Sequence, residues 1–209
     1  MWNDTNRYKP PQKGVRKPRP EPFTREEMLA ILGQYWRQRT EEIRNKALIV
    51  FLYRGAARVG ATLRMLPGDI DWKHNIVRIY KDKGGKTRSI SLDDRAMGFL
   101  RLWAEKRATL GVGDDRPFFC TVAPGRIGYH HSKVNVFQCF VKKCRRAGIT
   151  RHVNLHLLRH TGASELLEEG FDVATISRFL GHSSILTTYR YLHEIRPDLM
   201  NTRLAQREW

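Results

Sequence analysis

Residues 180–193 read Leu-Gly-His-Ser-Ser-Ile-Leu-Thr-Thr-Tyr-Arg-Tyr-Leu-His, a run that contains the end of one predicted helix and the start of the next. Gly181 can end one helix, because glycine readily adopts the left-handed conformation that commonly follows a helix. A further helix is predicted from about Ser183. His182 would therefore lie between two helices, and Tyr191 would follow it by nine positions on the second.

A second stretch, residues 155–160, reads Leu-His-Leu-Leu-Arg-His. On a helix, the i and i+3 spacing places His156 and Arg159 on one face, while the leucines can face the core. One imidazole and one guanidinium then project together. The pair alone is weak evidence, since His193 and Arg196 show the same spacing.

Caps and periodicity predict the elements around these stretches. Thr24 and Glu27 form a capping box that begins a helix. Strands at 75–80 and 87–92 flank a turn rich in lysine and glycine, which predicts a β-hairpin with a cationic tip. Helices are predicted at 24–36, 47–55, 93–109, 132–147, 155–169, 172–181, from about 183, and at 196–207. The predicted fold class is mainly α with a small antiparallel β-sheet or hairpin (α+β).

The composition predicts one globular domain with a tail. The chain has 209 residues, 41% of them hydrophobic, which suffices for one sizeable core. No stretch approaches the roughly 20 apolar residues that cross a bilayer, and no signal-peptide pattern is present, so we expect a soluble, intracellular protein. The cysteines lack Cys-x-x-Cys spacing and are interpreted as reduced, mostly core thiols, not as zinc ligands with the neighbouring histidines. The residues concerned are Cys120, Cys139, Cys144, His130 and His131.

The charge indicates a polyanionic partner. Lys and Arg number 38 against 21 Asp and Glu, a net charge of +17. This favours DNA or RNA over a ribosome-associated or membrane-surface role, although charge alone does not choose between them. Residues 1–22 are basic and proline-rich, and are predicted to be a linker or arm that either lies along DNA or is a solvated tether. Four cations near one helix end are candidates for DNA-backbone contact, namely Lys142, Lys143, Arg145 and Arg146.

The two quoted stretches form a recognisable set with Tyr191. Residues 156–161 read His-x-Leu-Arg-His-Thr, residues 180–184 read Leu-Gly-His-Ser-Ser, and the second of two threonines precedes Tyr191 by three positions. In this order they resemble the signature of the tyrosine recombinases of the phage-integrase family. The resemblance extends over about residues 23–195 and implies that family's catalytic-domain fold, with Tyr191 as the nucleophile.

Two upstream segments extend the resemblance. Residues 53–60 read Tyr-Arg-Gly-Ala-Ala-Arg-Val-Gly and are similar to the family's first-arginine segment, which makes Arg58 the first catalytic arginine. Residues 83–88 read Lys-Gly-Gly-Lys-Thr-Arg and resemble the family's lysine turn, which assigns the catalytic lysine to Lys83. Near rivals for this role are Lys81 and Lys86.

The chemistry of DNA cleavage suits these residue types. In-line attack on a phosphodiester builds negative charge that planar guanidiniums stabilise. A phenol becomes a nucleophile when a base and nearby cations help remove its proton, and a lysine can protonate the leaving 5′-oxygen. His156 is the candidate base, and His182 would donate a hydrogen bond to the phosphate. The implied catalytic set is Arg58, Lys83, His156, Arg159, His182 and Tyr191. The cations expected to contact DNA are Lys81, Lys86, Arg88, Lys142, Lys143, Arg145 and Arg146.

The resemblance implies an activity and partners. It implies a site-specific recombinase that cleaves and rejoins duplex DNA through a 3′-phosphotyrosine, with no metal, ATP or other cofactor. Its partners would be duplex DNA, further copies in a tetramer, and accessory DNA-bending or directionality proteins. Residues 196–209 would dock on a neighbouring protomer. The setting would be the cytoplasm of a bacterial cell or of a phage-infected host.

Other interpretations stay open. A type IB topoisomerase or a telomere resolvase uses a similar site, and a DNA-binding regulator could keep the fold without the chemistry. Ala61 stands where members commonly carry Glu, and the family's N-terminal core-binding domain is absent from the sequence, so an excised catalytic domain and a single-domain protein are both compatible. Taken singly, Arg58, Lys83 and Tyr191 could be ordinary surface, turn and core residues. Tyr189 is interpreted as structural, and His160 as either a support of the site or a helix-packing residue outside the catalytic set.

Overall fold

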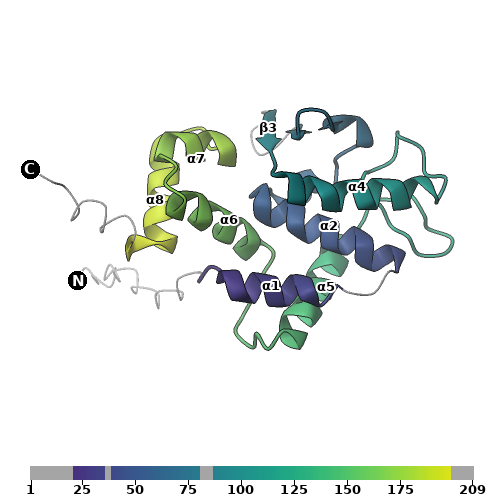
Figure 1. Ribbon diagram of the computed structural model, residues 1–209, viewed down its shortest axis with the longest axis horizontal. Coiled ribbons are helices and arrows are strands. Elements are labelled where there is room, and N and C mark those ends of the chain that lie inside the picture. The colour runs from purple at the N-terminus through teal and green to yellow at the C-terminus, as the bar shows by residue number, and fades with distance from the viewer. Residues whose placement is uncertain (1–20, 36–38, 81–86, 199–209) are drawn as a thin grey trace, which may run out of the picture.

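Helices form most of the fold in the computed structural model, which describes residues 21–35, 39–80 and 87–198 (Figure 1). The helices are α1 (Arg25–Gly33), α2 (Thr40–Arg54), α3 (Val59–Thr62), α4 (Asp94–Ala108), α5 (Lys133–Arg146), α6 (His156–Glu168), α7 (Val173–Leu180) and α8 (Ile185–Ile195), with a short 3-10 turn η1 (Pro67–Asp69). The predicted helices from 93 to 181 agree with α4 to α7 within two residues at each end.

Side-chain caps set where several helices begin. Thr24 accepts a hydrogen bond from the Glu27 amide and Glu27 accepts one from the Thr24 amide, which is the predicted capping box. The Asp93 side chain caps α4 by accepting from the Ala96 amide, and the Asp172 side chain caps α7 by accepting from the Thr175 amide. These oxygens satisfy amides that have no partner within their own helix.

A three-stranded antiparallel sheet accompanies the helices, in the order β1 (Ile70–Asp71), β2 (Ile76–Ile79), β3 (Arg88–Ser91). Val77 lies opposite Ile90, and both are fully buried. The prediction of a mainly α fold with a small antiparallel sheet is therefore confirmed. Strand β1 and helix α3 were not predicted, because two and four residues are too short to show a periodicity. Residues 81–86 of the predicted hairpin lie outside the described residues.

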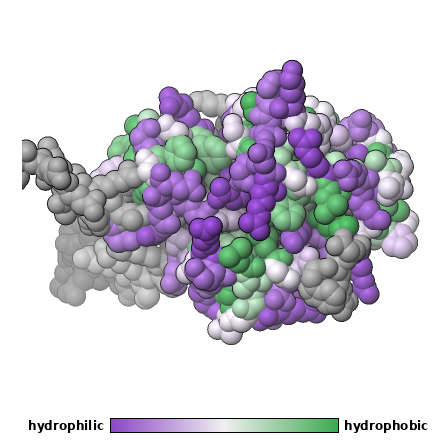
Figure 2. All heavy atoms as spheres, viewed as in Figure 1, coloured by the Kyte–Doolittle hydropathy of each residue, from purple (hydrophilic) through white to green (hydrophobic). Residues whose placement is uncertain are grey.

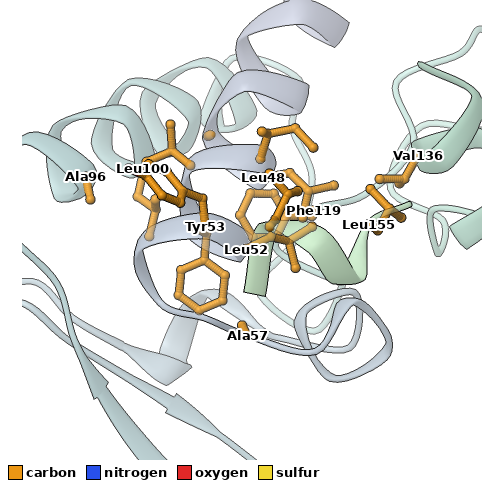
Figure 3. Packing of buried hydrophobic residues seen from close by; sticks show 14 of the residues in the cluster. Leu48, Leu52, Tyr53, Ala57, Ala96, Leu100, Phe119, Val136 and Leu155 are labelled. Atoms are coloured by element: carbon orange, nitrogen blue, oxygen red, sulfur yellow. The ribbon is translucent and has the colours of Figure 1, made fainter. Parts of the chain in front are cut away.

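Helix α2 is the centre of the larger core. Figure 3 shows Leu48, Leu52 and Tyr53 of α2 between Ala96 and Leu100 of α4 and, on the other side, residues of three further segments, Phe119, Val136 and Leu155. Burial runs without a break along α2 from Ala47 to Tyr53. Helix α2 is therefore buried on more than one side, because α4 and α6 both pack on it.

Helix α6 joins this core to a smaller one. Leu157 and Leu158 belong to the larger cluster, whereas Ala163 and Leu167 pack with residues of α7 and α8 in the smaller one. Gly162 lies between them, and a Cβ there would come within 2.2 Å of the Tyr53 carbonyl oxygen. Only glycine permits α6 to cross the end of α2 so closely. Helices α6, α7 and α8 therefore form one unit beside α2 (Figure 1).

Polar side chains cover much of the surface shown in Figure 2, with smaller apolar areas between them. No helix within residues 21–35, 39–80 and 87–198 is long and apolar enough to cross a membrane. Cys120 and Cys144 are buried and free, as predicted for core thiols. Most of the helix predicted at 196–207 lies outside the described residues, and α8 ends at Ile195.

Candidate active site

Arg159 of α6 is the most enclosed cation of the site. Its side chain is only 1% exposed. The guanidinium donates to the Ala56 carbonyl oxygen at 2.6 Å and to the Leu180 carbonyl oxygen at 2.9 Å. Ala56 directs its carbonyl inward from a left-handed conformation with φ +42°. Arg159 thus joins the end of α2 to the end of α7, and its position is fixed from both sides.

His182 lies where the sequence placed it, between α7 and α8. Gly181 adopts φ +67°, and a Cβ there would come within 2.7 Å of Arg88 Cδ. His182 Nε2 lies 3.2 Å from an Arg159 nitrogen, and its Nδ1 lies 2.8 Å from Thr188 Oγ1. Because an arginine can only donate, Nε2 is the acceptor and Nδ1 carries the proton. Burial, followed by the charges of Arg159 and other cations, lowers the pKa of His182 to about 4.

Tyr191 and Tyr189 lie on opposite sides of α8. Two residues are about 200° apart around a helix, whereas positions three and four apart share a face. Thr188, Tyr191 and Leu192 accordingly face the smaller core and the site, while Tyr189 is 46% exposed and stacks on His193. The spacing of the threonine and the second tyrosine therefore places Tyr191, and not Tyr189, at the site. The interpretation of Tyr189 as structural agrees with this geometry.

Two histidines contact the Tyr191 ring, and a third histidine contacts one of them. His160 lies parallel to it, with ring centroids 4.9 Å apart and an angle of 17°. His182 meets the same ring edge-on at 5.6 Å and 82°. His156 in turn meets His160 edge-on at 4.6 Å and 83°. His160 was left outside the catalytic set, but it is the histidine that covers the face of the phenol.

The Tyr191 hydroxyl is buried and has no hydrogen-bond partner of ordinary geometry among the described residues. Burial raises the pKa of Tyr191 above its usual range, and the nearby charges of Arg159 and Arg58 act against this rise. The phenol is therefore protonated at neutral pH in the protein alone. A phenol becomes a nucleophile only when a base and nearby cations help remove its proton.

Arg58 reaches the site from the short α3, which it precedes as N-cap residue. It lines a hollow of about 650 Å³ together with Arg64, Lys133 and His156. Ala61 also lines this hollow. The three cations suit a phosphate group, and sequence reasoning missed Arg64 and Lys133, because each is a lone basic residue without a motif.

His156 is the first residue of α6 and is exposed. Asn154 accepts hydrogen bonds from the amides of His156 and Leu157, and so caps this helix. Partial desolvation, then the charges of Arg159 and Arg58, lower the pKa of His156. The imidazole is thus kept in the neutral form that a general base needs.

The structure does not test the predicted catalytic lysine. Lys83 and its rivals Lys81 and Lys86 lie outside the described residues. Arg88, at the start of β3, donates to the Phe179 carbonyl oxygen at the end of α7 and is half-buried. Its side chain thus joins the sheet to the helix that precedes His182, and its contact with the DNA backbone stays a prediction.

The basic cluster at the end of α5 needs one correction. Lys142, Arg145 and Arg146 are exposed, and they remain predicted DNA contacts. Lys143 is buried, and its ammonium donates to the Gln34 carbonyl oxygen and to Glu42 Oε1, both at 2.7 Å. Lys143 is withdrawn from the predicted set, because this ion pair ties α5 to the segments before and within α2. The cluster is also remote from the active site. Lys133, at the start of α5, lines the hollow beside Arg58, and the cluster lies at the other end of this helix, whose 14 residues span about 20 Å.

Alanine substitution of two neighbouring lysines of α5 should affect different properties, folding stability for Lys143 and DNA binding for Lys142. We expect Lys143→Ala to lower the free energy of unfolding by about 3 kcal/mol, because Glu42 loses a buried cation. Lys142→Ala should leave the melting temperature unchanged and reduce the salt dependence of DNA binding by about one counterion. Thermal unfolding and DNA titrations at several salt concentrations measure both. A normal melting temperature for Lys143→Ala would contradict a stabilising ion pair between Lys143 and Glu42.

Acid should destabilise the protein through its buried histidines. Burial is the main cause that lowers the pKa of His131, His160 and His182 to about 4, against 6.5 for an ordinary histidine. Between these values the unfolded chain binds more protons than the folded one, so stability is expected to fall as the pH drops from about 6.5 toward 4. The loss should be on the order of 1 kcal/mol per histidine at pH 5.

Melting temperatures between pH 7.5 and 4.5 test this expectation. His131→Phe is the matched variant, since both ring nitrogens of His131 are buried without a partner in the described part of the chain. It should make the pH dependence shallower. A melting temperature of the unaltered protein that does not change with pH would contradict the expectation that these histidines are neutral in the folded state.

A larger hollow lies away from the site. It measures about 1250 Å³ and is bounded by α1, α2, α4, α6 and the end of α8. None of the predicted catalytic residues that the structure describes lines it, and its wall includes acidic side chains such as Glu165, Glu169 and Glu194. Mixed charge of this kind does not suit a DNA backbone. Among the described residues, no group of three His, Cys, Asp or Glu side chains is placed to hold a metal ion.

Two arginines, three histidines and a phenol with a buried hydroxyl thus meet in a helical domain, and a site of this composition is suited to an anion. The chain belongs to the phage integrase family, whose model matches residues 22–196. The resemblance to a tyrosine recombinase catalytic domain is confirmed.

Individual relatives agree with this membership. The chain is 31% identical over 170 residues to a tyrosine recombinase XerD of Bifidobacterium longum, covering 78% of this chain and 54% of that protein. It is 29% identical over 183 residues to a tyrosine recombinase XerC of Chlamydia caviae, covering 86% and 57%. The chain therefore spans just over half the length of these relatives.

Solved structures show the same fold. The crystal structure of XerA recombinase matches with a TM-score of 0.74 and 24% identity, over 96% of this chain and 68% of that one. The structure of XerH site-specific recombinase bound to palindromic difH substrate, a post-cleavage complex, matches with a TM-score of 0.72 and 24% identity, over 88% and 52%.

Proposed function

We propose that this chain is the catalytic domain of a site-specific recombinase that cleaves duplex DNA to give a 3′-phosphotyrosine at Tyr191 and a free 5′-hydroxyl. The observation that carries the proposal is the convergence of the buried Tyr191 phenol with Arg159 and His182, whose nitrogens lie 3.2 Å apart. Family membership supports it, as does the DNA in the complex of the similar XerH.

Binding of the scissile phosphate would rearrange one hydrogen bond. Arg159 donates to the Ala56 and Leu180 carbonyl oxygens. The same guanidinium also contacts His182 Nε2. When a phosphate oxygen accepts from Arg159, His182 Nε2 is released. The Thr188 hydroxyl can then donate to Nδ1, and Nε2–H can donate to the phosphate. Arg58 supplies the second positive charge.

The cleavage step balances without a cofactor. The Tyr191 oxygen bonds to phosphorus as the bond from phosphorus to the 5′-oxygen breaks. The phenolic proton passes to His156, the proposed base, and Lys83 is proposed to protonate the leaving 5′-oxygen. The phosphotyrosine keeps the energy of the broken ester, so attack by a partner strand's 5′-hydroxyl can rejoin DNA without ATP or metal.

Strand exchange between two sites requires several copies. We propose a tetramer on two duplexes with exchange through a Holliday junction, assisted by accessory DNA-bending or directionality proteins. Residues 196–209 are proposed to dock on a neighbouring protomer. Arg196 and Asp198 line the edge of the larger hollow, where this segment leaves α8. The proposed action on DNA fits the cytoplasm of a bacterial or phage-infected cell.

Covalent trapping tests the proposal. The protein is incubated with EDTA and nicked suicide duplexes from its own genetic flank, and denaturing gels are read for a protein–DNA adduct. Mass spectrometry should locate the adduct on the peptide that contains Tyr191. If DNA binds and no adduct forms, even with any upstream domain restored, the inactive-regulator alternative is correct. Relaxation of supercoils without strand exchange would favour the topoisomerase alternative.

A further inference from the structure

His160 contacts the proposed nucleophile through the flat face of its ring. The side chain is 8% exposed, and its plane lies within 17° of the Tyr191 ring at 4.9 Å. This distance is in the range of offset stacking. The His182 ring contacts the Tyr191 ring edge-on, with ring centroids 5.6 Å apart. The phenol is thus bounded on its face by α6 and on its edge by the α7–α8 junction.

We infer that His160 is a positioning residue whose ring fixes the plane of the Tyr191 phenol and so the direction of its attack on phosphorus. The inference rests on the proposed role of Tyr191. It goes beyond the catalytic set, in which His160 has no part.

The ring contacts, not a hydrogen bond of ordinary geometry, fix the plane of this phenol. Burial raises the pKa of the Tyr191 hydroxyl and the Arg159 guanidinium beside it acts against this rise, but the hydroxyl makes no hydrogen bond of ordinary geometry among the described residues. The phenolic oxygen lies about 6 Å from Cα, so a 20° swing of the ring displaces it by about 2 Å. In-line attack needs the reacting atoms aligned at about 3 to 3.5 Å, and a 1 Å error can cost about 100-fold in rate.

The geometry of α6 explains why one helix can do this. His156, Arg159 and His160 occupy positions i, i+3 and i+4, which share a face. One turn therefore presents the proposed base, the phosphate-binding guanidinium and the stacking ring together. Gly162 lets this turn pack closely against the end of α2, so the backbone that carries the His160 ring is held in place.

A proton-transfer role for His160 does not fit the contacts. A ring stacked face to face cannot take a proton from a hydroxyl that lies in the plane of its own ring. The groups that face His160 are His156 and Arg159 from its own helix and Tyr191 from α8. Burial, then these two neighbours on α6, lower the pKa of His160 to about 4, so the ring is neutral near pH 7.

Single-turnover cleavage and DNA affinity separate positioning from folding. We expect His160→Ala to slow adduct formation at least tenfold with an unchanged DNA Kd, and His160→Phe, which keeps a flat ring without nitrogens, to recover most of that rate. Melting temperatures check that both variants are folded. A wild-type rate for His160→Ala overturns the inference, and so does a His160→Phe rate as low as that of His160→Ala.

A second measurement does not depend on cleavage. With 3-fluorotyrosine placed at position 191 alone, the ¹⁹F resonance should be shifted by the stacked ring, move toward the free amino-acid value in His160→Ala, and stay shifted in His160→Phe. An unchanged resonance in His160→Ala overturns the inference. If the unaltered protein forms no adduct while this shift is present, the proposed function fails and the positioning of the ring stands.

Discussion

Replacement of Tyr191 by phenylalanine is expected to abolish the covalent DNA adduct. The change removes one oxygen atom, and the ring that packs on the smaller core and on His160 is kept. Because the hydroxyl makes no hydrogen bond of ordinary geometry in the described structure, folding should be nearly unaffected. DNA affinity should also stay within about threefold of that of the unaltered protein, since no charge is lost.

Tyr189→Phe is the matched control on the same helix. Tyr189 is 46% exposed and lies on the opposite side of α8, where it stacks on His193. Its variant should form the adduct at the rate of the unaltered protein. The two variants are compared on the same suicide duplex by denaturing gel and by thermal unfolding. An adduct with Tyr191→Phe, or its loss with Tyr189→Phe, would assign the nucleophile differently.

The sequence predicted the parts of this site that depend on local spacing. A threonine and a tyrosine three apart on a helix share a face, which separates Tyr191 from Tyr189. Glycine after α7 and aspartate before it fix both ends of that helix. The position of His182 between two helices follows from these signals alone.

Residues whose roles depend on distant partners were not predictable in this way. Lys143 belongs to a basic run, but Gln34 and Glu42, its partners, lie about 100 residues away in the sequence. Arg88 meets the end of α7 across a similar separation. His160 directly follows Arg159 in the sequence, and the structure was needed to show that its ring lies on that of Tyr191.

Arg159 illustrates how one side chain can serve the fold and the chemistry together. Its guanidinium satisfies two backbone carbonyls from segments that meet only in the folded chain. Fixing those carbonyls also fixes the guanidinium relative to His182 and Tyr191. The charge is therefore preorganised before DNA arrives, which is the condition under which electrostatic stabilisation of a transition state is most effective.

The second large effect is expected from Arg159→Ala. Loss of this side chain, which is 1% exposed, leaves the Ala56 and Leu180 carbonyls without their buried donor, at a cost of about 1 to 3 kcal/mol each. It also removes a charge that acts on the phosphate. We expect a melting temperature lower by at least 5 °C and adduct formation at least 1000-fold slower.

Arg159→Lys separates the two effects, because lysine keeps the charge and loses the planar fork. A single ammonium cannot reach both carbonyls and a phosphate oxygen with the same geometry, so DNA binding should be retained while cleavage stays at least 100-fold slow. Arg178→Lys, on the exposed side of α7, should match the unaltered protein in all three measurements. If Arg159→Lys cleaved at the normal rate, charge alone would explain the role of Arg159. The rigid link between Ala56 and Leu180 would then matter for folding only.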